Sequence, residues 1–323
     1  MKVYVSGLGA VGTSVVTNLI EYGNGNFTIF LDESNELGCQ ALKAQYGNDV
    51  HISSLDVCQP DLSILAGPSG SQIKQAEALL NVSSNIISTS DDLFEVNQFL
   101  ELDDLARSKN LSVVVGAGFM PGISCLLVRL AAHDLDQINT IMVSKVGTAG
   151  PACARQHHRA LSKESINWFD GEWVITRSGK GRVLLWFPEP IGAKDCYTAA
   201  LPSPILLRRK YPSVRRVSSR MEANRRDRLT SRLPMLRPPH NDGGPGAVRA
   251  EVRGSYNGEI KTNIYSVMDS PIIASSKMVY VLANRFLTGN TSLGVNGVAM
   301  CNDSKGLIKD LIALDIKVSI FGS

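Results

Sequence analysis

Long apolar runs are absent from this sequence of 323 residues, and none approaches the roughly 20 residues that a membrane-spanning helix needs. Its six cysteines form no C-x-x-C pair and show no metal-ligand spacing, which predicts free thiols in a reducing cytoplasm and no metal site. The apolar residues at the N-terminus fit a strand, so no signal peptide is expected. These absences predict a cytoplasmic protein that contacts neither a membrane nor a metal.

Aromatic residues are few, at 6% of the chain, and the basic segment 208–237 contains Tyr211 alone. This pattern argues against nucleic-acid binding, although a basic segment that binds an acidic macromolecule remains an alternative. Residues 1–120 carry 5 Lys or Arg against 14 Asp or Glu, whereas residues 205–253 carry 13 against 4. This asymmetry predicts an acidic first half and a second half that handles an anionic group, or a merely solvated basic face. The length favours two domains.

A glycine-rich turn opens the chain. Val3 and Val5 alternate with polar neighbours, and the motif G-x-G-x-x-G follows at Gly7, Gly9 and Gly12. Apolar residues then repeat at helical spacing, which predicts a strand, a tight turn and a helix. Glycines there let a pyrophosphate approach the backbone, and the first helical amides, at Ala10 and Val11, face its phosphates. The motif alone also fits an ordinary turn, but its context predicts dinucleotide binding.

An acid follows the second predicted strand. Asp32 comes twenty residues after Gly12, where a carboxylate can accept hydrogen bonds from an adenosine ribose. Glu33 comes next, and no Lys or Arg occurs before Lys43. Because two carboxylates without a nearby cation would repel a 2′-phosphate, we expect NAD(H) to be favoured over NADP(H).

Strands and helices alternate through the first 115 residues. Six apolar strands separated by helices predict an α/β fold with a Rossmann doubly wound parallel sheet. Ligands of such sheets bind at the carboxyl ends of the strands. The predicted cofactor-binding residues beyond those named above are Asp56, Ala66, Gly67, Ser90, Gly116 and Gly118. An alternative for Ser90 or Asp91 is to cap the helix that follows.

Several motifs together resemble the saccharopine dehydrogenase family. They are the opening fingerprint, A-G-P at 66–68, S-T-S-D-D at 88–92 and G-A-G-F-M-P-G-I-S at 116–124, with weaker matches at 186–192 and 254–265. The resemblance implies a homodimeric NAD(P)-dependent oxidoreductase of amino-acid metabolism, acting on a C=N or C=O bond. It also implies a second α+β domain with a mixed sheet. One departure is Met120, which stands where the family has an acid.

The expected organisation has three parts. Residues 1–125 form the Rossmann domain, and residues 126–270 form an α+β domain for substrate binding and dimerisation. Residues 271–323 return to the first domain, as the resemblance implies. An alternative to an enzyme is a dinucleotide-binding redox sensor or partner subunit without catalysis.

Hydride transfer needs a residue that moves one proton. The catalytic candidates are Lys145, Tyr197 and one of the adjacent histidines, of which His158 is preferred over His157. Each histidine also fits a surface or capping role.

Carboxylate substrates are gripped well by arginine, which forms two parallel hydrogen bonds. On a helix starting near Pro151, Arg155 and His158 share one face, and further arginines follow at 225 and 228. We expect a small-molecule carboxylate substrate to bind Arg155, Arg225 and Arg228.

Overall fold

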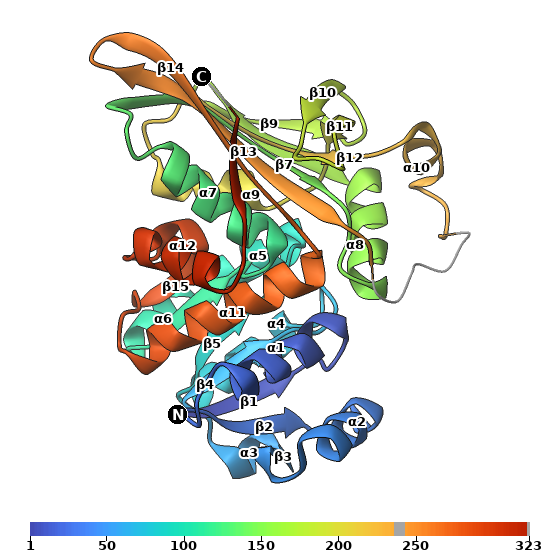
Figure 1. Cartoon of the computed structure of the whole chain (residues 1–323), viewed down its shortest axis with the longest axis vertical. Helices are drawn as coiled ribbons and strands as arrows, with labels where there is room; N and C mark the ends of the chain where they lie inside the picture. Colours follow the sequence, from blue (N-terminus) through green and yellow to red (C-terminus); the bar gives the residue numbers. More distant parts are fainter. Residues whose placement is uncertain (236–242, 322–323) are drawn as a thin grey trace.

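The computed structural model describes residues 1–235 and 243–321. Prolines and glycines in residues 233–246 predict a loop, and this stretch lies partly outside the described residues, over 236–242. No helix in the described ranges combines the length and apolar character needed to cross a bilayer. A parallel sheet occupies the lower half of Figure 1, a mixed sheet the upper half, and helices fill the space between them.

The first sheet has seven strands in the order β15-β6-β5-β4-β1-β2-β3, and every pairing in it is parallel. The strands are β1 (Lys2–Ser6), β2 (Thr28–Asp32), β3 (Val50–Ser53), β4 (Leu62–Leu65), β5 (Asn85–Ser88), β6 (Ser112–Val115) and β15 (Gly294–Gly297). Its central strands are apolar and buried on both faces, as a parallel sheet covered by helices requires. The predicted doubly wound fold is confirmed, with one further strand, β15, at the edge.

Helices alternate with these strands. They are α1 (Ala10–Glu21), α2 (Glu36–Tyr46), α3 (Leu55–Cys58), α4 (Ile73–Asn81), α5 (Leu93–Glu101) and α6 (Asp103–Ser108). In α1, Val15, Val16 and Leu19 are buried at three- and four-residue spacing, so one apolar stripe holds the helix on the sheet.

The second sheet is mixed and has nine strands. They are β7 (Gln137–Val146), β8 (Glu164–Phe169), β9 (Glu172–Arg177), β10 (Val183–Trp186), β11 (Ala193–Thr198), β12 (Arg216–Glu222), β13 (Gly246–Tyr256), β14 (Glu259–Asp269) and β16 (Val318–Phe321). The pair β7–β12 is parallel and the others are antiparallel. Its helices are α7 (Ser124–Ala131), α8 (Pro151–Ser162), α9 (Ser203–Lys210) and α10 (Arg225–Thr230).

The C-terminal segment contributes to both sheets. Its helix α11 (Pro271–Leu287) lies against α1, where Ser276 Oγ accepts hydrogen bonds from Ser14 at 2.8 Å and Asn18 at 3.0 Å. Strand β15 then joins the parallel sheet, α12 (Ser304–Ala313) packs on α11, and β16 pairs with β14 of the mixed sheet. The helix that carries the glycine turn is therefore held in place by residues more than 250 positions away.

Candidate functional site

The β1–α1 turn has the close packing that its glycines allow. Gly7 has φ +89°, and a Cβ there would collide with the backbone of Gly67 in the loop after β4. A Cβ on Gly12 would collide with the carbonyl of Gly7. By contrast, Gly9 has open space around it. Helix α1 starts at Ala10 with no side-chain cap and no acid in its first turn, so its amino end is free to meet an anion.

A cleft of about 370 Å³ opens between this turn and the second sheet. The parallel sheet contributes its β1–α1, β4, β5 and β6 loops, and the second domain contributes the end of β7 and the start of α8. Seven predicted cofactor residues line it, namely Gly7, Gly9, Ala10, Val11, Ala66, Gly67 and Gly118. Gly12 lies behind the turn and shapes it from there.

Asp32 ends β2 and is buried. Its Oδ2 accepts a hydrogen bond from Ser6 Oγ at 2.6 Å, and its Oδ1 accepts one from the Ser34 amide at 3.0 Å. Burial alone would raise the pKa of Asp32, but the hydrogen bonds from Ser6 and Ser34 outweigh it and the net pKa is lowered. The group is therefore a fixed carboxylate at this end of the parallel sheet, one turn before the cleft residue Asn35.

Besides Gly12 and Asp32, three more predicted cofactor residues are not part of the cleft lining. Asp56 is exposed on α3, Gly116 is buried against Pro121, and Ser90 is buried and donates to Glu95 at 2.5 Å. In this arrangement Gly116 and Ser90 stabilise the local backbone, by packing and by a hydrogen bond respectively, and Asp56 contacts solvent.

Glu95 is a residue that sequence reasoning missed. Its side chain, fully buried on α5, accepts hydrogen bonds from the amides of Gly70, Gln72 and Ile73 at 2.7–3.1 Å and from Ser90. These amides lie at the start of α4, which lacks a cap of its own. Glu95 thus fixes the loop after β4 that lines the cleft.

The charged centre of the cleft is a pair formed by Lys145 and Asp91. Lys145, 3% exposed at the end of β7, places Nζ 3.3 Å from Asp91 Oδ2, and Ser69 Oγ donates to Asp91 Oδ1 at 2.9 Å. Burial acts to lower the pKa of Lys145, but the Asp91 carboxylate outweighs burial and the net pKa is raised. A protonated amine is therefore held inside the cleft.

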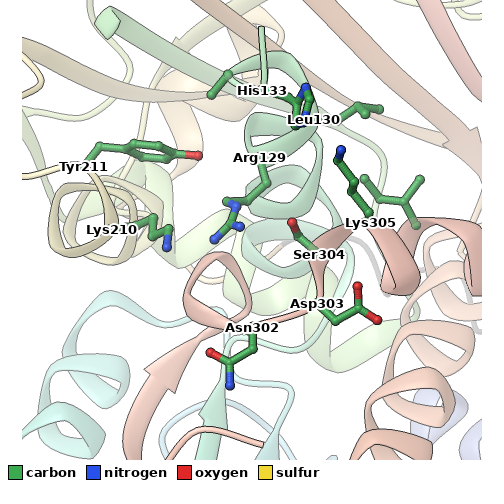
Figure 2. A pocket seen from close by; sticks show the side chains of 11 residues that line it. Arg129, Leu130, His133, Lys210, Tyr211, Asn302, Asp303, Ser304 and Lys305 are labelled. Atoms are coloured by element: carbon green, nitrogen blue, oxygen red, sulfur yellow. The ribbon is translucent and has the colours of Figure 1, made fainter. Parts of the chain in front are cut away.

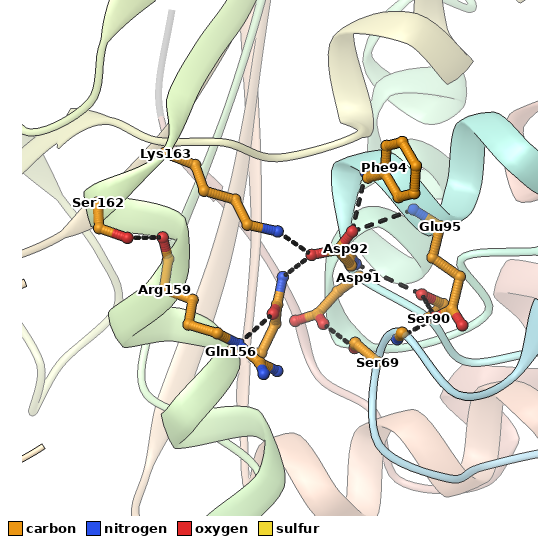
Figure 3. Close-up of polar contacts among 11 residues, drawn as sticks. Ser69, Ser90, Asp91, Asp92, Phe94, Glu95, Gln156, Arg159, Ser162 and Lys163 are labelled. Carbon is orange, nitrogen blue, oxygen red and sulfur yellow. Dashed lines mark hydrogen bonds and ion pairs between the residues drawn. The ribbon is translucent and has the colours of Figure 1, made fainter. Parts of the chain in front are cut away.

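The neighbouring acid has a different role. Asp92, not Ser90 or Asp91, caps α5, because its Oδ1 accepts from the amides of Phe94 and Glu95. Its Oδ2 accepts from Lys163 at 2.8 Å and from Gln156 at 2.9 Å, both of the second domain (Figure 3). Figure 3 also shows Asp91 turned towards Ser69. Of these two adjacent acids, Asp91 therefore lines the cleft and Asp92 joins the two domains.

The two histidines of α8 point away from the cleft lining. His158 is bonded through Nε2 to the carbonyl of Leu233 at 2.9 Å, and His157 to the carbonyl of Glu222 at 3.2 Å. Burial first, and then the charge of Lys145, lowers the pKa of His157 to about 3. Neither histidine reaches the space beside the glycine turn, whereas Cys153 of the same helix lines it.

The predicted arginines are divided between two places. Arg155, exposed on α8, lines the cleft. Arg225 and Arg228 line a separate open hollow with Tyr197, and the Arg228 guanidinium lies 4.1 Å from the centre of the Tyr197 ring. No residue of this hollow lines the cleft. Arg225 and Arg228 are three residues apart on α10, and this spacing carries no information on which cavity their face of the helix meets.

Other cleft residues carry no polar signal in the sequence. Met120, 3% exposed, presents a thioether at the position where the saccharopine dehydrogenase family, which this sequence resembles, has an acid. Met120, Phe119 and Pro271 add apolar walls, and Gly147, Ala149 and Gly150 bring second-domain backbone to the cleft. No group of three or more His, Cys, Asp or Glu that could hold a metal occurs within residues 1–235 and 243–321.

Comparison with known proteins gives matches in structure only. No family model matches the sequence, and no curated protein does. Saccharopine dehydrogenase (L-Glu forming) from Saccharomyces cerevisiae, solved without ligand, is 13% identical with a TM-score of 0.73, over 99% of this chain and 100% of that one. A homospermidine synthase from Legionella pneumophila in complex with NAD is 13% identical with a TM-score of 0.71, over 100% and 91%. DAP dehydrogenase from C. glutamicum in complex with DAP is 13% identical with a TM-score of 0.52, over 98% and 99%.

These matches confirm the resemblance to the saccharopine dehydrogenase family at the level of fold. Both sheets and the C-terminal segment take part, because the first match covers nearly the whole of both chains. At 13% identity the likeness concerns the fold, so any activity must be argued from the cleft itself.

Proposed function

We propose that this protein is an oxidoreductase that uses NAD(H) to transfer a hydride to or from the C=N or C=O carbon of a small substrate derived from an amino acid and an oxo acid. The observation that carries the proposal is the buried Lys145–Asp91 pair, which faces the glycine turn across a cleft between two domains. The solved relatives in fold support it, since one of them is in complex with NAD and two are named as dehydrogenases.

The glycine turn fits a dinucleotide. Space is open around Gly9, and the uncapped amides at Ala10 and Val11 lie on the cleft. A diphosphate placed there would meet backbone donors and the positive end of α1. When bound, the cofactor would supply the hydride chemistry, and the protein would supply position and a proton.

NAD(H) is favoured over NADP(H) because of Asp32. Its carboxylate is held in the ionised form by Ser6 and Ser34, and the residues lining the cleft include two cations only, Lys145 and Arg155, both from the second domain. A 2′-phosphate beside Asp32 would therefore meet a negative charge without a compensating arginine.

Lys145 would hold the proton. Its ammonium, kept charged by Asp91, would donate a hydrogen bond to the substrate nitrogen or oxygen. Hydride addition to the carbon makes the substrate nitrogen or oxygen far more basic, so the proton would then pass from Nζ to that nitrogen or oxygen. Asp91, fixed by Ser69, would stabilise the ammonium before the transfer and orient Nζ throughout.

The substrate would enter from the second-domain side. Arg155 on α8 lines the cleft and is exposed, so its guanidinium is free to grip a carboxylate with two hydrogen bonds. Met120 and Phe119 would pack on the substrate's apolar part and exclude water.

A panel of amino-acid and oxo-acid pairs, assayed by NADH absorbance, tests this proposal. We expect turnover with at least one pair and a strong preference for NADH over NADPH. Binding of NADH without turnover across the panel would instead indicate a non-catalytic redox sensor or partner subunit.

We also propose a homodimer that buries the outer face of the mixed sheet. Val248, Ala250 and Val252 of β13 face the core, so Arg249, Glu251 and Arg253 face outward. Arg249 is 7% exposed, yet its Nε and Nη1 have no hydrogen-bond partner among the described residues.

The unpaired Arg249 donors are buried within the chain itself, so a second copy would instead meet the exposed guanidinium of Arg253. Glu251 already accepts from Arg249 at 2.8 Å and from Arg253 at 3.0 Å, so the strand presents alternating charges. Two such rows related by a two-fold axis are self-complementary, because the arginines of one can meet the glutamate of the other.

The six cysteine thiols, all free, support our further proposal of a reducing cytoplasmic location.

A further inference from the structure

A second cavity, of about 460 Å³, lies between α7, the end of α9 and the start of α12. No residue that lines it lines the dinucleotide cleft. Figure 2 shows the side chains of Arg129, Lys210 and Tyr211 gathered on one side of it, with Lys305 and His133 on the other.

The charges around this cavity are unbalanced. Arg129, Lys210 and Lys305 are cationic, and neither lysine forms a hydrogen bond or ion pair with the described residues. Arg129 makes one bond, to the carbonyl of Ala299 at 2.9 Å. His133 is paired with Asp134 at 2.7 Å.

One carboxylate lines the cavity, and it is already engaged. Asp303 Oδ1 accepts from the Gly306 amide at 2.8 Å, and its Oδ2 lies 3.5 Å from Arg285. In Figure 2 this carboxylate points away from Arg129 and Lys210. The cations at the left of the cavity therefore have no anion of the described chain beside them.

Two neighbouring groups reflect this imbalance. Burial and the charge of Arg129 both lower the pKa of Lys210. Burial raises the pKa of Tyr211 to about 12 although Arg129 acts to lower it, so its hydroxyl remains a donor at neutral pH. A cavity lined by cations and hydroxyl donors, with no carboxylate facing Arg129 and Lys210, is complementary to an oxyanion.

We infer that this cavity binds the phosphate group of a small phosphorylated metabolite through Arg129, Lys210 and Tyr211. A phosphate monoester carries about −1.5 to −2 charges at neutral pH, which balances several cations better than one carboxylate does. The guanidinium can bind two of its oxygens side by side, and the lysine acts as a point charge. The volume exceeds that of phosphate alone, which leaves room for the rest of the molecule.

Binding of inorganic phosphate and of glycerol 3-phosphate to the full-length protein tests this inference. Melting temperature and calorimetry would be recorded at constant ionic strength, with sodium chloride and acetate as reference anions. The variants are Lys210→Met and Lys305→Met. Their matched controls are Arg209→Met, the exposed neighbour on α9, and Lys309→Met, one turn further along α12.

We expect both phosphates, but not chloride or acetate, to raise the melting temperature. Lys210→Met should weaken binding at least tenfold and, in phosphate-free buffer, should melt at or above the wild-type temperature, because it removes a cation that faces another cation. Tighter binding of glycerol 3-phosphate indicates a metabolite, and equal binding indicates free phosphate.

The inference would be overturned if neither phosphate bound, or if Lys210→Met bound both as the wild type does. The latter result would place phosphate elsewhere, for example at the β1–α1 turn. Neither result bears on hydride transfer, so this test and that of the proposed function fail independently.

Discussion

Lys145 Nζ lies 3.3 Å from Asp91 Oδ2, and this ion pair connects the last residues of a mixed-sheet strand to the loop after a parallel-sheet strand. Both side chains are largely buried, so the pair interacts more strongly than one in water would. Its position beside the glycine turn brings the proposed proton donor and the proposed dinucleotide site into one cleft. The two domains are thus joined at the point where we place the chemistry.

Replacing Lys145 should affect catalysis more than folding. Lys145→Met keeps the apolar stem and removes the proton, and we expect kcat to fall by about 10²- to 10⁴-fold, as is typical for loss of a general acid. Lys145→Arg, which keeps the charge but is a far weaker acid, should retain NADH binding with a similarly reduced kcat. Steady-state kinetics and NADH titration provide the measurement.

Lys74→Met is the control for this pair of variants, because Lys74 is exposed on α4 and does not line the cleft. An unchanged kcat in Lys145→Met would eliminate Lys145 as the donor.

Glu95 should stabilise both the fold and the cofactor site. Glu95→Gln puts an NH₂ group in place of one oxygen, either Oε2, which accepts from the Gly70 amide and Ser90, or Oε1, which accepts from the amides of Gln72 and Ile73. We expect a loss of about 2 kcal/mol in the free energy of unfolding and weaker NADH binding, since the loop after β4 loses a contact. Urea denaturation checks the first effect, and Glu101→Gln at the exposed end of α5 is the matched control.

His157 should make the protein less stable in mild acid. Its pKa is about 3 in the folded protein against about 6.5 in an unfolded chain, so the unfolded state gains a proton first as the pH falls. The contribution of neutral His157 to the free energy of unfolding is complete above pH 6.5 and is lost as the pH falls below it. Between pH 7 and pH 5 the loss from this group is about 2 kcal/mol.

Urea denaturation of His157→Gln at both pH values measures that contribution. The variant should lose about 2 kcal/mol less than the wild type over this interval, whereas His51→Gln, on the exposed edge strand β3, should behave as the wild type does. Identical pH dependence in His157→Gln and wild type would contradict the buried neutral histidine.

The outer face of the mixed sheet should hold two copies together. Glu251→Arg would place three arginines in a row on β13 and remove the acceptor for Arg249 and Arg253, so we expect a monomer. Sedimentation velocity measures the change, with Glu259→Arg at the exposed end of the same hairpin as the control. A wild-type monomer at micromolar concentration would refute the dimer.

Local signals in the sequence predicted the Rossmann sheet well. The turn from Gly7 to Gly12 depends on backbone freedom within six residues, and the apolar strands carry their own periodicity. Strand β15 was missed because Gly-Val-Asn-Gly has neither alternation nor β-branched residues on both sides. It is a strand because the edge of β6 provides free backbone partners, which only the tertiary fold reveals.

The site was harder to predict because its parts are distant in sequence. Asp91 and Asp92 are equally suitable helix caps, and the choice depends on Lys145 and Lys163, more than 50 residues away. Tyr197 and Arg228 were chosen by residue type, and the structure places them in another hollow. The type of a side chain indicates which chemistry it can perform, but the cavity that the side chain faces depends on the tertiary fold.

The most direct test of dinucleotide binding uses Gly9, whose Cβ position is open. Aspartate is a preferred N-cap residue, so Gly9→Asp should fold at least as stably as the wild type while placing a bulky negative charge where the diphosphate would lie. Calorimetric titration with NADH is the measurement. We expect saturable binding to the wild type and at least tenfold weaker binding to Gly9→Asp. Equal affinity in the two proteins, or no binding to a folded wild type, would contradict the dinucleotide site at the β1–α1 turn.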